Sequence, residues 1–357
     1  MPSSRGNIGN WSELYALASL VVNKGAYGPR QTVDSSKSMF FRVLEIYVED
    51  SNPTASLHYV IGEDEVHLER PGAHPFVLAV DQIAEAMADL LIDLKSDLAS
   101  RHFSTGAGEK LLQLLGKQNI GASSSQRISD FELIIADPQT NNPSPRTGYS
   151  VKSSVGSPAT LLNASGATNF IYEITHPDSL DPMDFLEGDS LANHVRQMLG
   201  AGFAISFRSM QSRVFEQNLM RVDSLMPELV AEVLLNSFNV NVQNTFASAV
   251  ESTFSLQDPL GLQRIFKMKQ LLGSIAMGLR PTDSWDGDST KFKGMIHVDQ
   301  NLDLIFNYQH NQIDFWDYLF ANLKFETASR SRHGYGRVYL ENGKFYIKLN
   351  LQIRFIR

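Results

Sequence analysis

The fold of this 357-residue chain centres on the segment RISDFELIIADPQTNNPSPRTGYSVKSSVG, residues 127–156. Two apolar runs, Phe131–Ala136 and Tyr149–Val155, flank a cluster of Asp, Asn and Pro residues. Short β-prone runs around such turn formers predict two strands joined by a loop. Because the loop carries three prolines, we expect it to be exposed and irregular.

Folding this segment back at Asn141–Asn142 places Lys152 on the second strand opposite Asp130 at the start of the first. Opposed side chains of an antiparallel pair lie within about 5 Å of each other. Ser150 shares the face of Lys152, whereas Val151 points the other way into apolar packing. A carboxylate that holds Mg²⁺ beside a lysine that orients water is suited to phosphodiester hydrolysis. The spacing fits a simple cross-strand ion pair equally, since such a pair contributes about 0–1 kcal/mol at a surface.

The composition excludes several classes of protein. The hydrophobic content of 43% is ordinary for a globular chain with a full core. The absence of cysteine excludes disulfides, thiolate metal sites and cysteine catalysis. The N-terminus lacks a secretory pattern, and no stretch approaches the roughly 20 apolar residues of a membrane span. We therefore expect a soluble, cytoplasmic protein without a membrane partner.

Charge is distributed unevenly along the chain. The formal net charge is −8, yet residues 321–357 hold eight Lys/Arg against two acids, a charge of +6 that leaves −14 for the residues before them. Such a basic end can bind a polyanion while the acidic body repels it elsewhere. Basic tails are also often only solvated, so the charge by itself leaves a nucleic-acid partner open.

Apolar spacing predicts a helix over 11–23, with Asn10 or Ser12 as its cap. Glu13 near its start fits either a favourable charge at a helix N-terminus or a further carboxylate for the metal site. Strands are expected over 40–70, followed by helices at 81–99 and 107–116, in a region so acidic that we expect it to face away from DNA.

After the central hairpin, Ser157 and Pro158 predict the start of a short helix, and Asn169–Ile174 a strand. Asn163 and Asn169 belong to a polar cluster whose amides can read bases or phosphates, or simply cap the backbone. Helices are expected between 190 and 278, strands at 292–298 and 302–307, and a helix at 314–323. Near the end, Glu341–Lys344 is a strong hairpin signal, preceded by an arginine-rich loop.

Six blocks of the sequence together resemble the HpaII family of type II restriction endonucleases. The resemblance covers most of the chain and is weakest over 40–120. The blocks are GNWSELYAL (9–17), DFELIIAD (130–137), GYSVKSSVG (148–156), TLLNASGATNFIY (160–172), SRHGYG (331–336) and ENGKFYIKLNLQIRF (341–355).

The resemblance implies a PD-(D/E)XK nuclease core that cuts duplex DNA with Mg²⁺. It assigns Asp130 as the metal-binding aspartate and Lys152 as the catalytic lysine. The metal would be held by Asp130, the Val151 carbonyl and Glu13. Ser150 departs from the pattern, because many such nucleases have Asp or Glu at this position, and we expect Glu13 to supply the missing carboxylate.

The resemblance also implies CCGG, or a related short palindrome, as the target and double-stranded DNA as the partner. A palindromic target requires a homodimer or a monomer that cuts twice. A companion DNA methyltransferase is expected genetically, not as a physical partner. The candidate DNA-binding residues are Arg330, Arg332, His333, Arg337, Asn163, Asn169 and Gln211.

We therefore predict an α/β (α+β) protein with a mixed β-sheet flanked by helices, added helices and a C-terminal β-hairpin region. Residues 1–210 would form the catalytic core, with an acidic insertion at about 40–120, and residues 211–357 a region for DNA recognition. The predicted activity is Mg²⁺-dependent, sequence-specific cleavage of duplex DNA that leaves 5′-phosphates. Alternatives are a structure-selective repair or recombination nuclease, a DNA-binding protein with a vestigial site, and a structural protein.

Overall fold

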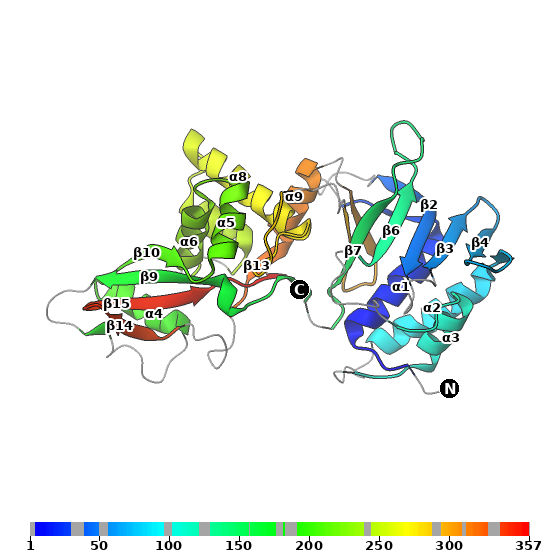
Figure 1. Ribbon diagram of the computed structural model, residues 1–357, viewed down its shortest axis with the longest axis horizontal. Helices are drawn as coiled ribbons and strands as arrows, with labels where there is room; N and C mark the ends of the chain where they lie inside the picture. The colour runs from blue at the N-terminus through cyan, green and yellow to red at the C-terminus, as the bar shows by residue number, and fades with distance from the viewer. Residues whose placement is uncertain are drawn as a thin grey trace. The chain divides into compact units, whose positions relative to one another are not determined.

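The computed structural model describes most of the chain in twelve segments (Figure 1). They are residues 4–29, 39–49, 56–95, 102–120, 129–156, 158–175, 181–182, 191–238, 244–287, 294–308, 312–327 and 336–356. The chain forms two compact units. The first comprises residues 1–159 and 289–315 with Arg357, and the second comprises residues 160–288 and 316–356. The boundary expected near residue 210 therefore differs from this division, and the functional roles of the two parts stay predictions.

The first unit is built on a nine-stranded mixed sheet in the order β1-β12-β11-β7-β6-β2-β3-β4-β5. Strand β1 also pairs with β2, which closes β1, β12, β11, β7, β6 and β2 into a six-stranded, barrel-like ring. The β1–β12 and β11–β7 pairs are parallel. The strands are β1 (Gly25–Tyr27), β2 (Phe40–Glu49), β3 (Ser56–Ile61), β4 (Val66–Glu69), β5 (Phe76–Val77), β6 (Phe131–Ile135), β7 (Thr147–Ser153), β11 (Gly294–Val298) and β12 (Leu304–Tyr308).

Three helices belong to this unit, α1 (Ile8–Asn23), α2 (Val80–Lys95) and α3 (Gly106–Leu114). Helix α1 contacts α2, α3 and strand β7, and its Trp11 is fully buried. A Cβ on Gly108 of α3 would lie 2.2 Å from the Trp11 ring, so this position requires glycine. The predicted cap of α1 is wrong, because Asn7 caps the helix in a capping box with Asn10.

The segment expected as an insertion at 40–120 contributes to this same core. Strands β2–β5 belong to the nine-stranded sheet, and their inward side chains pack in one hydrophobic cluster with α1 and β7. Alternation of buried and half-exposed residues along β3 and β4 leaves the polar side chains on the other face. The acidic composition of this stretch therefore belongs to one face of a core sheet.

The second unit contains two smaller sheets, of order β10-β9-β15-β14 and β13-β16-β8. Its strands are β8 (Thr160–Leu162), β9 (Asn169–Thr175), β10 (Ala204–Met210), β13 (Leu323–Phe325), β14 (Val338–Glu341), β15 (Lys344–Asn350) and β16 (Ile353–Phe355). Its helices are α4 (Leu191–Gly200), α5 (Arg213–Val222), α6 (Met226–Asn236), α7 (Phe246–Thr253) and α8 (Pro259–Ala276), and α9 (Gln312–Asn322) spans the last boundary between the units.

Two local predictions in the second unit have different outcomes. The hairpin at Glu341–Lys344 is confirmed, with Asn342 and Gly343 both at positive φ as its turn type requires. The helix expected after Pro158 is wrong, because Thr160–Leu162 pairs with β16 and a 3-10 turn follows at Gly166–Thr168. Tertiary pairing outweighs the local N-terminal helix signal here. The coarse prediction of a mixed α/β fold with helices and several sheets is confirmed.

Candidate active site

Asp130 lies at the entrance of β6, where the backbone is already bonded to β7. Its amide N–H donates to the Tyr149 carbonyl at 2.8 Å, and its Oδ2 accepts from the Val151 amide at 2.7 Å. These two bonds hold the carboxylate at the edge of the sheet. Burial raises the pKa of Asp130, while the bond from Val151 and the charge of Lys152 oppose that shift.

The register of the hairpin differs from the prediction. Phe131 pairs with Tyr149, so the antiparallel pairing ends before Lys152, which does not stand opposite Asp130. The turn runs from Asp137 to Asn142, where the Asp137 amide donates to the Asn142 carbonyl at 2.8 Å and the Asn141 amide to the Asp137 carbonyl at 2.7 Å, so its middle lies before Asn141–Asn142. Lys152 instead lies beside β11 in the parallel pair.

Glu13 lies on α1 and lines the same pocket as Asp130. Because the helix begins at Ile8, Glu13 is in the second turn, and the charge at the helix N-terminus does not account for its position. Burial first, and the nearby Asp130 second, raise the pKa of Glu13 to about 8, although Lys152 and Lys117 act in the opposite direction. Two carboxylates that each disfavour the charge of the other form a site that a cation would stabilise.

Lys117 was not among the candidate residues from the sequence, yet it lines the pocket with Glu13 and Asp130. It follows Gly116, whose φ of +71° ends the turn after α3, and its amide donates to the Leu112 carbonyl at 2.8 Å. In the sequence a Gly-Lys pair after an apolar helix indicates an ordinary helix end, so no local signal marks it. The pocket is completed by Asn10, Leu14, Leu17, Val48, Glu49, Ile120 and Phe131.

Ser150 and Val151 lie on β7, directly before Lys152 in the sequence. Both are buried, with 6% of their surface exposed, and Val151 belongs to the core cluster, as its alternation predicts. Ser150 offers a neutral hydroxyl where a second strand carboxylate is usual. The second acidic group of this pocket therefore comes from helix α1.

The chemistry of the pocket fits a magnesium ion. Glu13 and Asp130 provide carboxylate oxygens, and Mg²⁺ commonly uses one or two carboxylates and completes its shell with water and substrate oxygens. Within the described segments, no three His, Asp or Glu side chains gather as a metal-binding group. Glu49 also lines the pocket without joining such a group, so a metal held by Glu13 and Asp130 relies on other oxygen ligands.

The candidate DNA-binding residues of the second unit have different surroundings. Arg337, Asn163 and Gln211 are exposed, whereas Asn169 is fully buried and supports its neighbours. Arg330, Arg332 and His333 lie outside the described residues. Among the described helices, none is long and apolar enough to cross a membrane.

Comparison with known proteins agrees with these features. The family model of the HpaII restriction endonuclease matches residues 7–355. The type II restriction enzyme HpaII of Haemophilus parainfluenzae is 31% identical over 362 residues, which is 98% of each chain. No solved structure matches the chain. The chain therefore belongs to the HpaII restriction endonuclease family, a family of type II site-specific endonucleases.

Proposed function

We propose that this protein cuts double-stranded DNA in a Mg²⁺-dependent reaction, at CCGG or a related short palindrome, and leaves 5′-phosphate ends. The observation that carries the proposal is the meeting of Glu13 and Asp130 in one pocket, under the charges of Lys152 and Lys117. Carboxylates with raised pKa values beside lysines are typical of active sites. The family membership supports DNA as the substrate of that site.

The metal-binding residues would be Asp130, Glu13 and the Val151 carbonyl. When bound, Mg²⁺ supplies Lewis acidity and neutralises charge on the phosphate. Asp130 is held for this role by the Val151 amide at 2.7 Å, and Glu13 by the rigid second turn of α1. We infer that the ring of strands around β6 and β7 serves as the PD-(D/E)XK core of this chain.

The lysines would assist the attacking water. Water attacks the phosphorus in line with the 3′ leaving oxygen, which breaks the P–O3′ bond and leaves the phosphate on the 5′ end. Lys152 orients this water and offsets charge that develops on the phosphate. Lys117 provides a second positive charge on the same pocket. The Ser150 hydroxyl is buried beside them and has the smaller role of fixing β7.

Recognition would come from the exposed Arg337, Asn163 and Gln211 of the second unit, together with Arg330, Arg332 and His333. A palindrome would be cut on both strands by a homodimer. A companion DNA methyltransferase would protect the DNA of the host cell, and the enzyme would act in the cytoplasm.

The test is digestion of a fully sequenced plasmid with Mg²⁺, followed by mapping of the ends. Wild type, Lys152→Met and the control Lys110→Met, which removes an exposed charge from α3, are compared. We expect discrete ends within one short motif for wild type and the control, and none for Lys152→Met. Ends without a shared motif would favour the structure-selective nuclease, and binding without cleavage would leave the vestigial site.

A further inference from the structure

A chain of three side-chain amides crosses the four-stranded sheet of the second unit. Asn350 of β15 donates from Nδ2 to Asn169 Oδ1 of β9 at 2.7 Å. Asn169 donates from its own Nδ2 to Gln211 Oε1 at 3.0 Å. Gln211 follows β10 directly, and its backbone N–H donates to the Asn169 carbonyl at 3.0 Å. We call these three residues the amide chain.

Both ends of the amide chain fix the direction of every bond within it. At one end Asn350 Nδ2 also meets the Ser165 carbonyl at 2.7 Å, an oxygen that can only accept. At the other end the Lys348 ammonium, which can only donate, meets Gln211 Oε1 at 3.2 Å. No amide can turn over without placing donor against donor or acceptor against acceptor.

This order has a structural cost. Asn350 is 5% exposed, and its Oδ1 has no hydrogen-bond partner within the described structure. A buried unsatisfied amide oxygen is unfavourable, and turning the amide over would only replace it by two broken bonds. Apolar side chains at these positions would pack without leaving a buried polar atom unsatisfied. The amide chain is therefore expected to have a function at its exposed end, Gln211.

The result of this order is a fixed donor at the surface. Gln211 Oε1 already accepts two bonds, and its Nε2 has no partner within the described residues. Gln211 is exposed, and Ser212 immediately after it caps helix α5, so the residue is held between a strand and a helix. The Nε2 group of this exposed residue lies beside Gly166, where an added Cβ would come within 3.5 Å of it, so its two N–H groups are fixed in place by a rigid support.

The surroundings of this donor are positively charged. Lys348 contacts it directly, and the Gly336 amide donates to the Lys348 carbonyl at 2.7 Å, so the exposed Arg337 follows on the β14 side of strand β15, across the sheet from β10. Arg208 and Arg213 are exposed and lie within three residues of Gln211 in the chain. Of the two acids on the strands of this sheet, Glu173 is paired with Lys344 at 2.7 Å, and Glu341 lies at the hairpin turn that ends β14. Such a surface attracts the DNA backbone.

We propose that Gln211 is a specificity-determining residue that reads guanine by donating from Nε2 to its N7 or O6 in the major groove. The inference rests on the proposed function. A free glutamine pairs with adenine by donating to N7 and accepting from N6, but the occupied Oε1 prevents that second bond. Cytosine offers a donor at N4, which the Nε2 hydrogens oppose. Adenine presents only N7 and thymine only O4 as an acceptor in the major groove, whereas guanine presents both N7 and O6, so guanine is the favoured base.

The experiment measures equilibrium binding with Ca²⁺ in place of Mg²⁺, so that cleavage does not interfere. The probes are a duplex centred on the site at which wild type cuts the plasmid, or on CCGG if it does not cut, and a scrambled duplex. Gln211→Glu keeps the inward acceptor but presents an oxygen outward, so we expect selectivity for the site to fall about 10- to 100-fold. Replacing guanine by 7-deazaguanine or 6-thioguanine should weaken wild type, and should add little in Gln211→Ala.

A second pair of variants tests the amide chain. Lys348→Met frees the Gln211 oxygen, and Lys344→Met removes one charge from the same strand without touching it. Both should weaken binding to all DNA, but only Lys348→Met should reduce discrimination between guanine and adenine.

Three results would overturn the inference. The first is an equal loss of affinity for the site and scrambled duplexes in Gln211→Glu, which would assign the donor to a phosphate. The second is a loss of affinity for the guanine analogues that persists in Gln211→Ala. The third is a wild type that binds both duplexes with equal affinity. A wild type that discriminates yet does not cut overturns the proposed cleavage and leaves this inference standing.

Discussion

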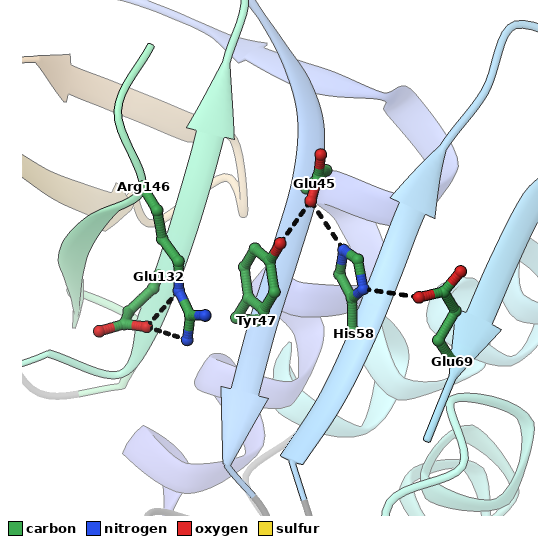
Figure 2. A network of polar contacts seen from close by, with 6 residues as sticks. All are labelled: Glu45, Tyr47, His58, Glu69, Glu132 and Arg146. Atoms are coloured by element: carbon green, nitrogen blue, oxygen red, sulfur yellow. Dashed lines mark hydrogen bonds and ion pairs between the residues drawn. The ribbon is translucent and has the colours of Figure 1, made fainter. Parts of the chain in front are cut away.

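Two groups of acidic side chains in the first unit are arranged in opposite ways. Glu13 and Asp130 share a pocket on the side of helix α1, where each raises the energy of the other. Glu45, Glu69 and Glu132 lie on the face of β2, β4 and β6 that points away from the apolar core (Figure 2). Both groups belong to the same unit, and the difference lies in their partners.

On the outer face every carboxylate has a donor. His58 lies between Glu45 and Glu69, at 2.8 and 2.9 Å, and Tyr47 donates to Glu45 (Figure 2). The hydrogen bond from Tyr47 lowers the pKa of Glu45 despite some burial, and burial with that same bond raises the pKa of Tyr47 to about 12.

The network ends at Arg146, which donates from Nε to Glu132 at 2.7 Å and lies 3.7 Å from the centre of the Tyr47 ring. Such an arrangement stabilises charge that is already present. The pocket instead holds charge that the fold disfavours, which is the condition under which a cation or a substrate phosphate gains most by binding. The comparison separates acids that hold the sheet from acids that we propose to bind the metal.

Asp130→Asn should have the largest effect on cleavage and should distinguish the two groups of acidic side chains most clearly. The amide keeps an oxygen for the Val151 N–H but loses the charge that binds metal, so we expect cleavage to fall by at least about 10³-fold. The matched control is Glu132→Gln, two residues along the same strand, which should cut at the wild-type rate. The measurement is the single-turnover cleavage rate, with DNA affinity determined in parallel. Equal losses in both variants would remove the distinction.

The sequence predicted part of this site for physical reasons that are local. Asp130 and Lys152 could be predicted because each lies in or beside a short apolar run, and the two runs flank a turn. Alternation of side chains with a period of two residues identifies such runs as strands. The predicted register is wrong by two residues because the Asn pair forms the end of a turn that begins at Asp137, and not its middle. Glu13 followed from the resemblance, and only the packing of α1 against β7 brings its helix to the site.

Glu13→Gln should change stability with pH in the metal-free protein. Because folding raises the pKa of Glu13 from 4.5 to about 8, the folded state retains a proton that the unfolded state releases, so stability falls as pH rises through this window. Removing the group should stabilise the protein at pH 9 by up to about 5 kcal/mol and leave pH 4 unchanged.

Glu45→Gln provides the opposite sign for this measurement. Because folding lowers the pKa of Glu45, its ionised form stabilises the protein above the ordinary pKa, and this stabilisation is lost as the pH falls. The variant should therefore be less stable than wild type at pH 9. Denaturant unfolding at pH 4 and pH 9 reports both signs. Mg²⁺ should raise the melting temperature of wild type at pH 9 and have less effect in Glu13→Gln. A Glu13 variant with the pH profile of wild type would contradict the buried carboxylate.

Most helices and strands were predictable, and the exceptions share one cause. Periodic apolar stripes located α1, α2 and α8, because each buries one face against its own unit. Closure of the six-stranded ring depends on β1, three residues whose pairing with both β2 and β12 has no signal in their sequence. Lys117 was missed for the same reason, since pairing and packing between distant segments bring it to the pocket.

Lys117→Met tests whether that second charge belongs to the chemistry. It lowers the pKa of Glu13 together with Lys152, so its loss should weaken the ionised pocket and the hold on the phosphate. We expect a fall of about 10- to 100-fold in the cleavage rate, smaller than for Asp130→Asn. The control Lys110→Met removes a charge from the neighbouring helix α3 and should have no effect. A Mg²⁺ titration that shifts only in Lys117→Met would connect this lysine to the carboxylates.

Arg146→Gln should have the smallest effect and tests the other side of the comparison. The Arg146 and Glu132 side chains are 49% and 45% exposed, so the ion pair and the ring contact together should contribute no more than about 1 kcal/mol. We expect a small decrease in the free energy of unfolding, and this decrease should be smaller at high salt. The cleavage rate and the Mg²⁺ requirement should be unchanged. Tyr47→Phe keeps the ring that Arg146 contacts and loses only the hydrogen bond to Glu45, so its effect should add to that of Arg146→Gln. A cleavage defect in either variant would show that charge on the outer face reaches the pocket, and the two groups of acids would then form one system.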